Sequence, residues 1–377
     1  MAERLKILLS GMVAGDPRQG GASWAVLQYV AGLEELGYEV MLVEPVPVEA
    51  LDPVGEVASY FESLPLIAGR AALLGRESER TVGASYAELA EFARGADLLL
   101  NVSGMLRDER LLEPIPVRAF LDLDPGFNQV WQATGAEMGF DLHTHFVTVG
   151  VCIGADDCPI PTLGRDWIPT LPPVALAHWP VVDVAPARDA FTSVGHWRSY
   201  GSIEYEGIHY GQRAHALRPL FELPRLSEER FELALGIHPD EVEDLRALHE
   251  HGWGLLDPYE VAGRPGEYAA FIRRSKAELC VAKSGYVASR SGWFSDRSAC
   301  YLASGRPVIA QDTGCGKSVP TGEGLLLFDS AIEAAAAVES LACDWARHRS
   351  SARELAEEYF DARRVLPRLL EKLAGSS

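Results

Sequence analysis

The chain has 377 residues, enough for about two domains of ordinary size. Hydrophobic residues make up 47% and charged residues 23%, proportions that are typical of a folded soluble protein and exclude a disordered or fibrous chain. With 34 Lys and Arg against 54 Asp and Glu, the formal net charge is −20. Such a surface repels nucleic acids and anionic lipid, so we expect no nucleic-acid partner, and any anionic ligand needs a local cluster of cations.

The cysteines and the first residues indicate a cytoplasmic location. The six cysteines lack the spacing of a CxxC unit, which favours buried small side chains in a reducing compartment. The apolar run in MAERLKILLSGM is too short for a signal-peptide core, and acidic Glu3 precedes it. No segment has the run of apolar residues that a membrane span requires.

The first half alternates between predicted strands and helices. A continuous apolar run predicts a buried strand over Leu5–Ser10, and a loop follows that ends at Gly20 and Gly21. Ser23 is expected to begin a helix with one apolar face, which Gly37 ends. Further predicted elements are a strand at 38–43, a helix at 86–93 and strands at 97–100 and 117–123. This alternation predicts a parallel sheet with helices on both faces.

Two polar groups follow strands of this half. In FLDLDPG, Asp124 lies at the carboxyl tip of the strand and is a candidate base or partner of an acceptor hydroxyl. In HTHF, His145 leads into another apolar strand, and a histidine near a cleft can accept a proton at neutral pH. A structural, hydrogen-bonded histidine is the alternative for His145.

A proline-rich stretch from Pro161 to Pro186 separates the two halves, and we place the interdomain linker at its end. The second half repeats the α/β rhythm. Its predicted strands are 190–194, 231–235, 253–256, 279–282, 308–310 and 325–328, with helices at 239–249 and 265–274, a helix after Ser330 and a last helix at 352–373. The sequence thus predicts two doubly wound α/β domains, 1–182 and 183–350, and a C-terminal helical segment, 351–377.

The stretch 289–314 predicts a loop, a short helix that begins at Ser295, a stop at Gly305 and a buried strand. A loop that runs into a helix N-terminus offers free N–H donors and the positive end of the helix dipole, which together can hold a phosphate. We therefore expect Ser295, Asp296, Arg297 and Ser298 to contact a diphosphate. Helix capping by Ser295 and Asp296 is the alternative.

Other cations and one aromatic residue join this predicted site. Lys283 follows the strand 279–282 at its carboxyl end, the edge at which open α/β sheets bind ligands, and Tyr286 lies just beyond it. Arg213 carries a permanent charge that matches phosphate oxygens. Each of these cations could instead be an ordinary surface charge. The GCGKS segment at 314–318 imitates a P-loop, but Gln311 stands where glycine is required, and we reject an NTPase.

Three segments resemble the GT-B glycosyltransferases, which have two Rossmann-like domains facing across a cleft. They are GGASWAVLQYVAGLEELGYEVMLVE, VGHWRSYG with YGQR downstream, and CYLASGRPVIAQDTG. The resemblance implies a C-terminal helix that packs back toward the N-terminal domain. It also implies acceptor or sugar contacts from Gly20 and Gly21 and donor-side contacts from Gly195, Arg213 and Gly314.

The resemblance departs from the family pattern at one point. In retaining members an acidic pair flanks the start of the helix, and its positions fall here on Gly292 and Cys300. Asp296 lies one turn before Cys300 and could take over the ribose contact.

The implied function is a metal-independent hexosyltransferase without a cofactor. It would move a sugar from a nucleotide-diphosphate sugar to a hydroxyl of a small-molecule acceptor. A sugar-nucleotide epimerase or hydrolase of the same fold is one alternative, and a non-catalytic nucleotide-sugar-binding protein is another.

Overall fold

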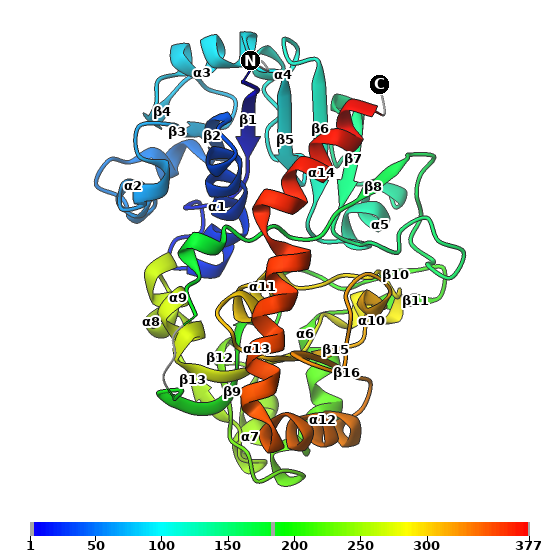
Figure 1. Ribbon diagram of the computed structural model, residues 1–377. Coiled ribbons are helices and arrows are strands. Elements are labelled where there is room, and N and C mark those ends of the chain that lie inside the picture. Colours follow the sequence, from blue (N-terminus) through cyan, green and yellow to red (C-terminus); the bar gives the residue numbers. More distant parts are fainter. Residues whose placement is uncertain (1–3, 182–184, 376–377) are drawn as a thin grey trace.

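The computed structural model describes residues 4–181 and 185–375, which form two α/β lobes (Figure 1). The strands of the first lobe are β1 (Lys6–Ser10), β2 (Glu39–Val46), β3 (Ala71–Gly75), β4 (Thr81–Gly83), β5 (Leu98–Val102), β6 (Val117–Asp122), β7 (His145–Thr148) and β8 (Trp167–Pro169). Its helices are α1 (Gly20–Glu35), α2 (Glu56–Glu62), α3 (Tyr86–Arg94), α4 (Glu109–Leu112) and α5 (Phe127–Ala133). The strands form one eight-stranded sheet, in the order β4-β3-β2-β1-β5-β6-β7-β8.

The second lobe has a six-stranded parallel sheet in the order β13-β12-β9-β14-β15-β16. These strands are β9 (Arg188–His196), β12 (Phe231–Gly236), β13 (Gly254–Leu256), β14 (Ser275–Cys280), β15 (Val308–Gln311) and β16 (Leu325–Phe328), and a separate hairpin consists of β10 (Ile203–Tyr205) and β11 (Ile208–Tyr210). The helices are α6 (Arg213–Leu217), α7 (Val242–Glu250), α8 (Pro258–Val261), α9 (Pro265–Arg274), α10 (Ser284–Ala288), α11 (Asp296–Ala303), α12 (Ala331–Cys343) and α13 (Trp345–Leu355), and the last helix, α14 (Ala362–Gly375), returns to the first lobe.

The predicted fold of two doubly wound α/β domains is confirmed. Strand β1 is nearly the predicted segment, and Ile7, Leu8 and Leu9 have no exposed surface because helices cover both faces of a parallel sheet. The predicted domain boundary between residues 182 and 183 lies outside the described residues. The boundary predicted at residue 351 falls inside α13.

Helix α1 begins at Gly20, three residues before the predicted start at Ser23. The reason is a close approach of the second lobe. The Gly20 N–H donates to the Ala262 carbonyl at 3.1 Å, and a Cβ on Gly20 would lie 2.4 Å from the Arg264 carbonyl oxygen. Only glycine allows this contact, so the first turn of α1 is placed by the opposite lobe.

The prediction of one continuous last helix is wrong. The helix is interrupted by a π-helical turn at Ala356–Phe360 and by Asp361, which forms a β-bridge with Val174. The Val174 N–H donates to the Phe360 carbonyl at 2.7 Å, and its carbonyl accepts from the Ala362 N–H at 2.9 Å. These bonds take the backbone groups that a continuous helix would need, so α13 ends and α14 begins anew.

Helix α14 packs against α1 of the first lobe, as expected for the C-terminal helix (Figure 1). A Cβ on Gly32 would lie 2.5 Å from the Cβ of Ala362, so glycine on α1 permits this close helix contact. Within 4–181 and 185–375, no helix is long and apolar enough to cross a membrane.

Candidate functional site

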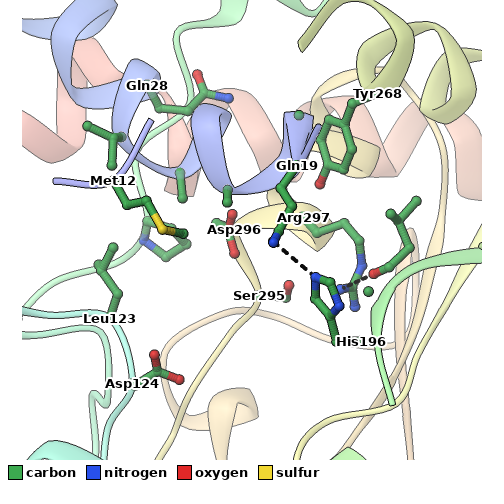
Figure 2. Close-up of a pocket in the computed structure, with 18 of the residues that line it drawn as sticks. Met12, Gln19, Gln28, Leu123, Asp124, His196, Tyr268, Ser295, Asp296 and Arg297 are labelled. Atoms are coloured by element: carbon green, nitrogen blue, oxygen red, sulfur yellow. Dashed lines mark hydrogen bonds between the residues drawn. The ribbon is translucent and has the colours of Figure 1, made fainter. Parts of the chain in front are cut away.

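A cavity of about 360 Å³ lies between the two lobes, a volume in the range of small-molecule sites. Its walls come from the segments that follow β1, β5 and β6 in the first lobe, and from the end of β9 and the segments that follow β13 and β14 in the second. The first turns of α1 and α11 complete them. Figure 2 shows side chains from both lobes pointing into this space. The carboxyl ends of both sheets therefore meet at one site, as in other open α/β sheets.

Arg213 lies in the wall of this cavity without a counter-ion. Its Nε donates to the Val281 carbonyl at 3.1 Å, while Nη1 is buried and has no hydrogen-bond partner among the described residues. Within the same residues, no carboxylate lies at ion-pair distance from it. Burial, and secondarily the charge of Arg297, lower the pKa of Arg213 to about 10, so it remains a cation at neutral pH. A buried cation in this state favours an anion beside it.

Gly195 makes room for this guanidinium. A Cβ at Gly195 would lie 1.7 Å from Nη1 of Arg213, so a larger residue would displace the side chain. Gly195 lines the cavity at the end of β9. Its geometry explains why a glycine stands there, and its predicted role at the donor stays a prediction.

Arg297 also lines the cavity, but its guanidinium is already paired. Its Nε donates to the carboxylate of Glu278, whose side chain has no exposed surface, and Nη1 donates to the Val194 carbonyl at 2.8 Å. Burial opposes the charge, yet Glu278 outweighs burial and raises the pKa of Arg297 well above its ordinary value. Arg297 is therefore the counter-ion of a buried glutamate as well as a neighbour of the cavity.

Asp124 joins the two lobes. Its carboxylate accepts hydrogen bonds from Lys283 Nζ at 2.6 Å, from the Tyr200 hydroxyl at 2.7 Å and from the Tyr286 hydroxyl, all three on the second lobe. Burial alone would raise the pKa of Asp124, but Lys283 and the hydroxyls outweigh it and hold the pKa below its ordinary value. Asp124 is thus an anion at neutral pH. Its own loop is fixed by Asp122, which accepts the Asp124 N–H at 3.0 Å.

The first turn of α11 faces the cavity with Ser295 and Asp296 (Figure 2). Ser295 is the N-cap of α11, but its side chain makes no capping hydrogen bond, so the capping alternative does not account for it. Burial raises the pKa of Asp296 despite the Arg297 charge and the nearby backbone N–H groups. A ligand phosphate at this turn therefore has the Asp296 carboxyl group as a neighbour.

Three predicted site residues lie away from the cavity. His145 begins β7 and pairs with Ala119, at the amino end of the strand, so its expected place near the cleft is wrong. Ser298 is buried beside Cys280 inside the second lobe. Gly314 has a left-handed φ of 91° and contacts Cys152 of the first lobe. The other predicted site residues line the cavity, and their predicted roles stay predictions: Gly20, Gly21, Asp124, Gly195, Arg213, Lys283, Tyr286, Ser295, Asp296 and Arg297.

Comparison with known proteins identifies the architecture. Neither a protein-family model nor a curated protein sequence matches the chain. Solved structures, in contrast, match the chain. An alpha-glucosyltransferase in complex with UDP-glucose and DNA containing an abasic site matches with a TM-score of 0.62 and 12% identity, over 98% of this chain and 99% of that chain. These structures are GT-B glycosyltransferases. The chain has the GT-B fold.

Two further GT-B structures match over similar lengths. Anabaena Alr3699/HepE in complex with UDP has a TM-score of 0.57 and 13% identity, over 98% of this chain and 100% of that chain. Sucrose-phosphate synthase from Thermosynechococcus elongatus has a TM-score of 0.59 and 14% identity, over 99% and 100%. The GT-B resemblance of the sequence is therefore confirmed for the fold.

The missing acidic pair of the GT-B pattern has a structural explanation. Gly292 has a left-handed φ of 74°, and a Cβ there would lie 2.7 Å from the Cys152 sulfur, which leaves no space for a carboxylate. Cys300 is buried against α1, where Gln28 Nε2 donates to its sulfur at 3.3 Å. Both positions are used for packing between the GT-B lobes, so neither can hold a ligand.

His196 is a cavity residue that the sequence interpretation missed. It ends β9, and its Nε2 contacts Gln19 Oε1 of the first lobe at 3.0 Å (Figure 2). An amide oxygen only accepts, so Nε2 carries the proton and Nδ1 has a free lone pair. Burial, then the nearby Arg213 charge, lower the pKa of His196 and keep it neutral at pH 7. Its position directly after Gly195 in the segment VGHWRSYG is the feature that could have identified it from the sequence.

Glu44 of β2 fixes the loop after β1. Its carboxylate accepts the backbone N–H groups of Val13, Ala14 and Gly15 at 3.0, 2.8 and 2.7 Å. Glu44 is 1% exposed and holds the first-lobe wall of the GT-B cleft in place. Among the described residues, no group of three His, Cys, Asp or Glu side chains forms a metal-binding cluster.

Proposed function

We propose that this chain is a glycosyltransferase that moves a sugar from a nucleoside-diphosphate sugar to a hydroxyl group of a small acceptor. The observation that carries the proposal is the buried guanidinium of Arg213, which faces the interlobe cavity without a counter-ion. A diphosphate supplies the missing negative charge and matches the guanidinium geometry. Solved structures with this fold and UDP or UDP-glucose support the same class of ligand.

In the proposed reaction, the bond between the anomeric carbon and the diphosphate oxygen breaks while the acceptor oxygen bonds to that carbon. Arg213 and Lys283 stabilise the negative charge that develops on the leaving diphosphate. Asp124 accepts a hydrogen bond from the acceptor hydroxyl, orients it and takes its proton as the acceptor oxygen bonds to the anomeric carbon, a role that suits an anionic carboxylate. In this scheme side chains neutralise the diphosphate, so the reaction requires no metal.

The proposed acceptor is small. The net charge of −20 opposes a polyanionic acceptor, although one of the matching structures is an alpha-glucosyltransferase in complex with DNA. The first lobe contributes Met12, Ser103 and Leu123 to the cavity, which gives the acceptor side both polar and apolar contacts. The cytoplasmic location stays a prediction from the sequence.

The test is an assay of nucleoside-diphosphate release from a panel of nucleotide sugars, with and without small hydroxyl acceptors. We expect release that depends on acceptor in the wild type and a loss of about 10²-fold in the Arg213→Met variant. Arg110→Ala, a change at an exposed arginine outside the cavity, is the control. Release without acceptor would assign a hydrolase instead, and tight nucleotide binding without release would assign a binding protein.

A further inference from the structure

The rim of the cavity carries a pair of side chains that the proposed reaction does not use. The Arg18 guanidinium of the first lobe lies 5.3 Å from the centre of the Tyr259 ring of the second lobe. Both residues line the cavity, and both are exposed, with 40% of Tyr259 accessible. An exposed aromatic ring at the mouth of a binding cavity is a surface on which a flat group can stack.

The two residues are held very differently. Tyr259 is in the first turn of α8, where Asp257 Oδ1 accepts its N–H at 2.8 Å and Pro258 fixes the backbone, so the ring is presented from a firm base. The Arg18 side chain reaches the Tyr259 carbonyl only at 3.5 Å, the outer limit of a hydrogen bond. The guanidinium can therefore move off the ring at little cost.

The backbone of Arg18 also departs from ordinary geometry. Its φ of 65° is left-handed, a region that residues other than glycine seldom adopt. Such a conformation costs energy and persists where the surroundings hold it, often at ligand sites. Here the next residue, Gln19, contacts His196, and Gly20 donates to the Ala262 carbonyl, so contacts across the cleft fix the loop that presents Arg18.

The pair lies beside the proposed diphosphate position. The nearby charge of Arg213 lowers the pKa of His196, and the same histidine contacts Gln19, the neighbour of Arg18. Asp124 lies on the opposite side of the cavity from Gln19 (Figure 2). The cavity thus offers an unpaired cation in its wall and an exposed aromatic ring with a mobile guanidinium. A nucleoside diphosphate has the matching groups, an anionic centre and a flat aromatic base at one end.

We propose that Tyr259 and Arg18 form the nucleobase site, in which the base stacks on the Tyr259 ring and Arg18 moves onto the outer face of the base. This inference rests on the proposed function and adds to it the residues that hold the base. A planar ring and a guanidinium both bind the π-face of any base. The site therefore selects nucleotides as a class, and contacts elsewhere select among bases.

The experiment compares a nucleotide with a ligand that lacks the base. Calorimetric titration measures the dissociation constants of UDP, ADP, GDP and inorganic pyrophosphate for the wild type, Tyr259→Leu and Arg18→Ala. For the nucleotide that the wild type binds most tightly, we expect Tyr259→Leu to weaken binding about tenfold or more, while pyrophosphate binding changes less than about twofold. Arg18→Ala should act in the same direction with a smaller effect.

A matched control is available in the first lobe. The exposed Arg110 lies 4.7 Å from the centre of the half-buried Tyr86 ring, an arginine–tyrosine pair away from the cavity, and Arg110→Ala should leave all four constants unchanged. Unchanged nucleotide binding in Tyr259→Leu would overturn the nucleobase site while the proposed function stands. Equal weakening of nucleotide and pyrophosphate would overturn it too, since the pair would then act only on the lobe arrangement. A wild type that binds none of the nucleotides would overturn both proposals.

Discussion

At the residue scale, the cavity contains two arginines with opposite electrostatic situations. Arg297 is matched by the buried Glu278, whereas Arg213 has no carboxylate at ion-pair distance among the residues that the structure describes. The sequence could predict that both residues lie at the site, Arg297 from the helix that begins at Ser295 and Arg213 from the resemblance of its YGQR segment. It could not predict which of them is neutralised, because Glu278 is distant in sequence from Arg213 and its orientation depends on how β14 pairs.

Replacing Arg213 should separate stability from activity. Arg213→Met removes a buried cation without a counter-ion and one hydrogen bond to Val281, so we expect the free energy of unfolding to change by no more than about 1 kcal/mol. Turnover should nevertheless fall about 10²-fold because the diphosphate loses its main cation. Urea denaturation and a release assay on the same preparation measure both quantities. A large loss of stability would contradict the absence of a counter-ion.

Replacing Arg297 should have the reverse signature. Arg297→Met leaves Glu278 buried without a partner, and the free energy of unfolding should fall by about 3 to 5 kcal/mol. The double variant Arg297→Met/Glu278→Gln should recover part of this loss, because no buried charge remains. Urea denaturation of the single and double variants is the measurement. Equal stability of the two variants would show that the ion pair is not what Arg297 contributes.

His143 supplies a prediction on pH. It is buried, its Nδ1 donates to the Gly139 carbonyl at 2.7 Å, and burial lowers its pKa to about 4 from an ordinary value of 6.5. The unfolded chain therefore binds more protons between these values, and stability falls as the pH drops. We expect this residue to cost about 2 kcal/mol between pH 7 and pH 4.5. Urea denaturation of the wild type and of His143→Gln at both pH values measures how much of the change in the free energy of unfolding is due to His143. Equal losses in the two proteins would refute the prediction.

At the scale of elements, local pattern predicted most of the strands and helices, and contacts between lobes decided where it failed. Helix α9 begins and ends as predicted, because its caps and apolar face are local. The start of α1 and the break before α14 depend on backbone bonds to Ala262 and Val174, which no local window contains. His145 was misplaced for a different reason, because a residue that leads into a parallel strand lies at the amino edge of the sheet, whereas the cavity lies at the carboxyl edge.

The loop after β6 carries the next prediction. Asp124 holds Lys283 and two tyrosines of the other lobe, so Asp124→Asn should weaken the contact between lobes and lower turnover. The pKa of Asp124 is held below its ordinary value, so the wild-type contact is fully formed above about pH 4 and is lost as the pH falls through the lowered pKa. A buried charge left on Lys283 should cost about 3 kcal/mol or more. Asp156→Asn, at an exposed aspartate, is the control for the denaturation experiment. Equal stability of the Asp124 variant and the wild type would refute this role.

At the scale of the whole molecule, the two lobes are joined on more than one side of the cavity. On one side Gly20 contacts Ala262, and on the other Gly150 forms a β-bridge with Trp293. The rings of Trp24 in α1 and Trp179 have their centres 5.1 Å apart, and Trp24 Nε1 donates to the Pro265 carbonyl. One apolar cluster therefore runs through both lobes. The alternation of strands and helices in the sequence predicted the two lobes. It could not predict this shared core, because the core residues are spread along the chain.

A shared core predicts a small change of shape on ligand binding. Small-angle scattering with and without saturating UDP should give radii of gyration that agree within about 1 Å. The release assay on the same sample is the control for activity. An unchanged radius of gyration then means that an active protein binds UDP without closing. A contraction of several ångströms would show that the lobes separate in solution and close on the nucleotide.

The path of the backbone between the lobes has a consequence for biosynthesis. The chain passes from the first lobe to the second after β8 and returns at Asp361, and the two passages are joined by the bridge between Val174 and Asp361. In this topology the second lobe is an insertion into the first, whose helix α1 is covered by α14. A ribosome therefore finishes the second lobe before it releases the last part of the first. The lobe that is translated earliest is the one completed latest, and loss of α14 would damage the half of the molecule farthest from it in sequence.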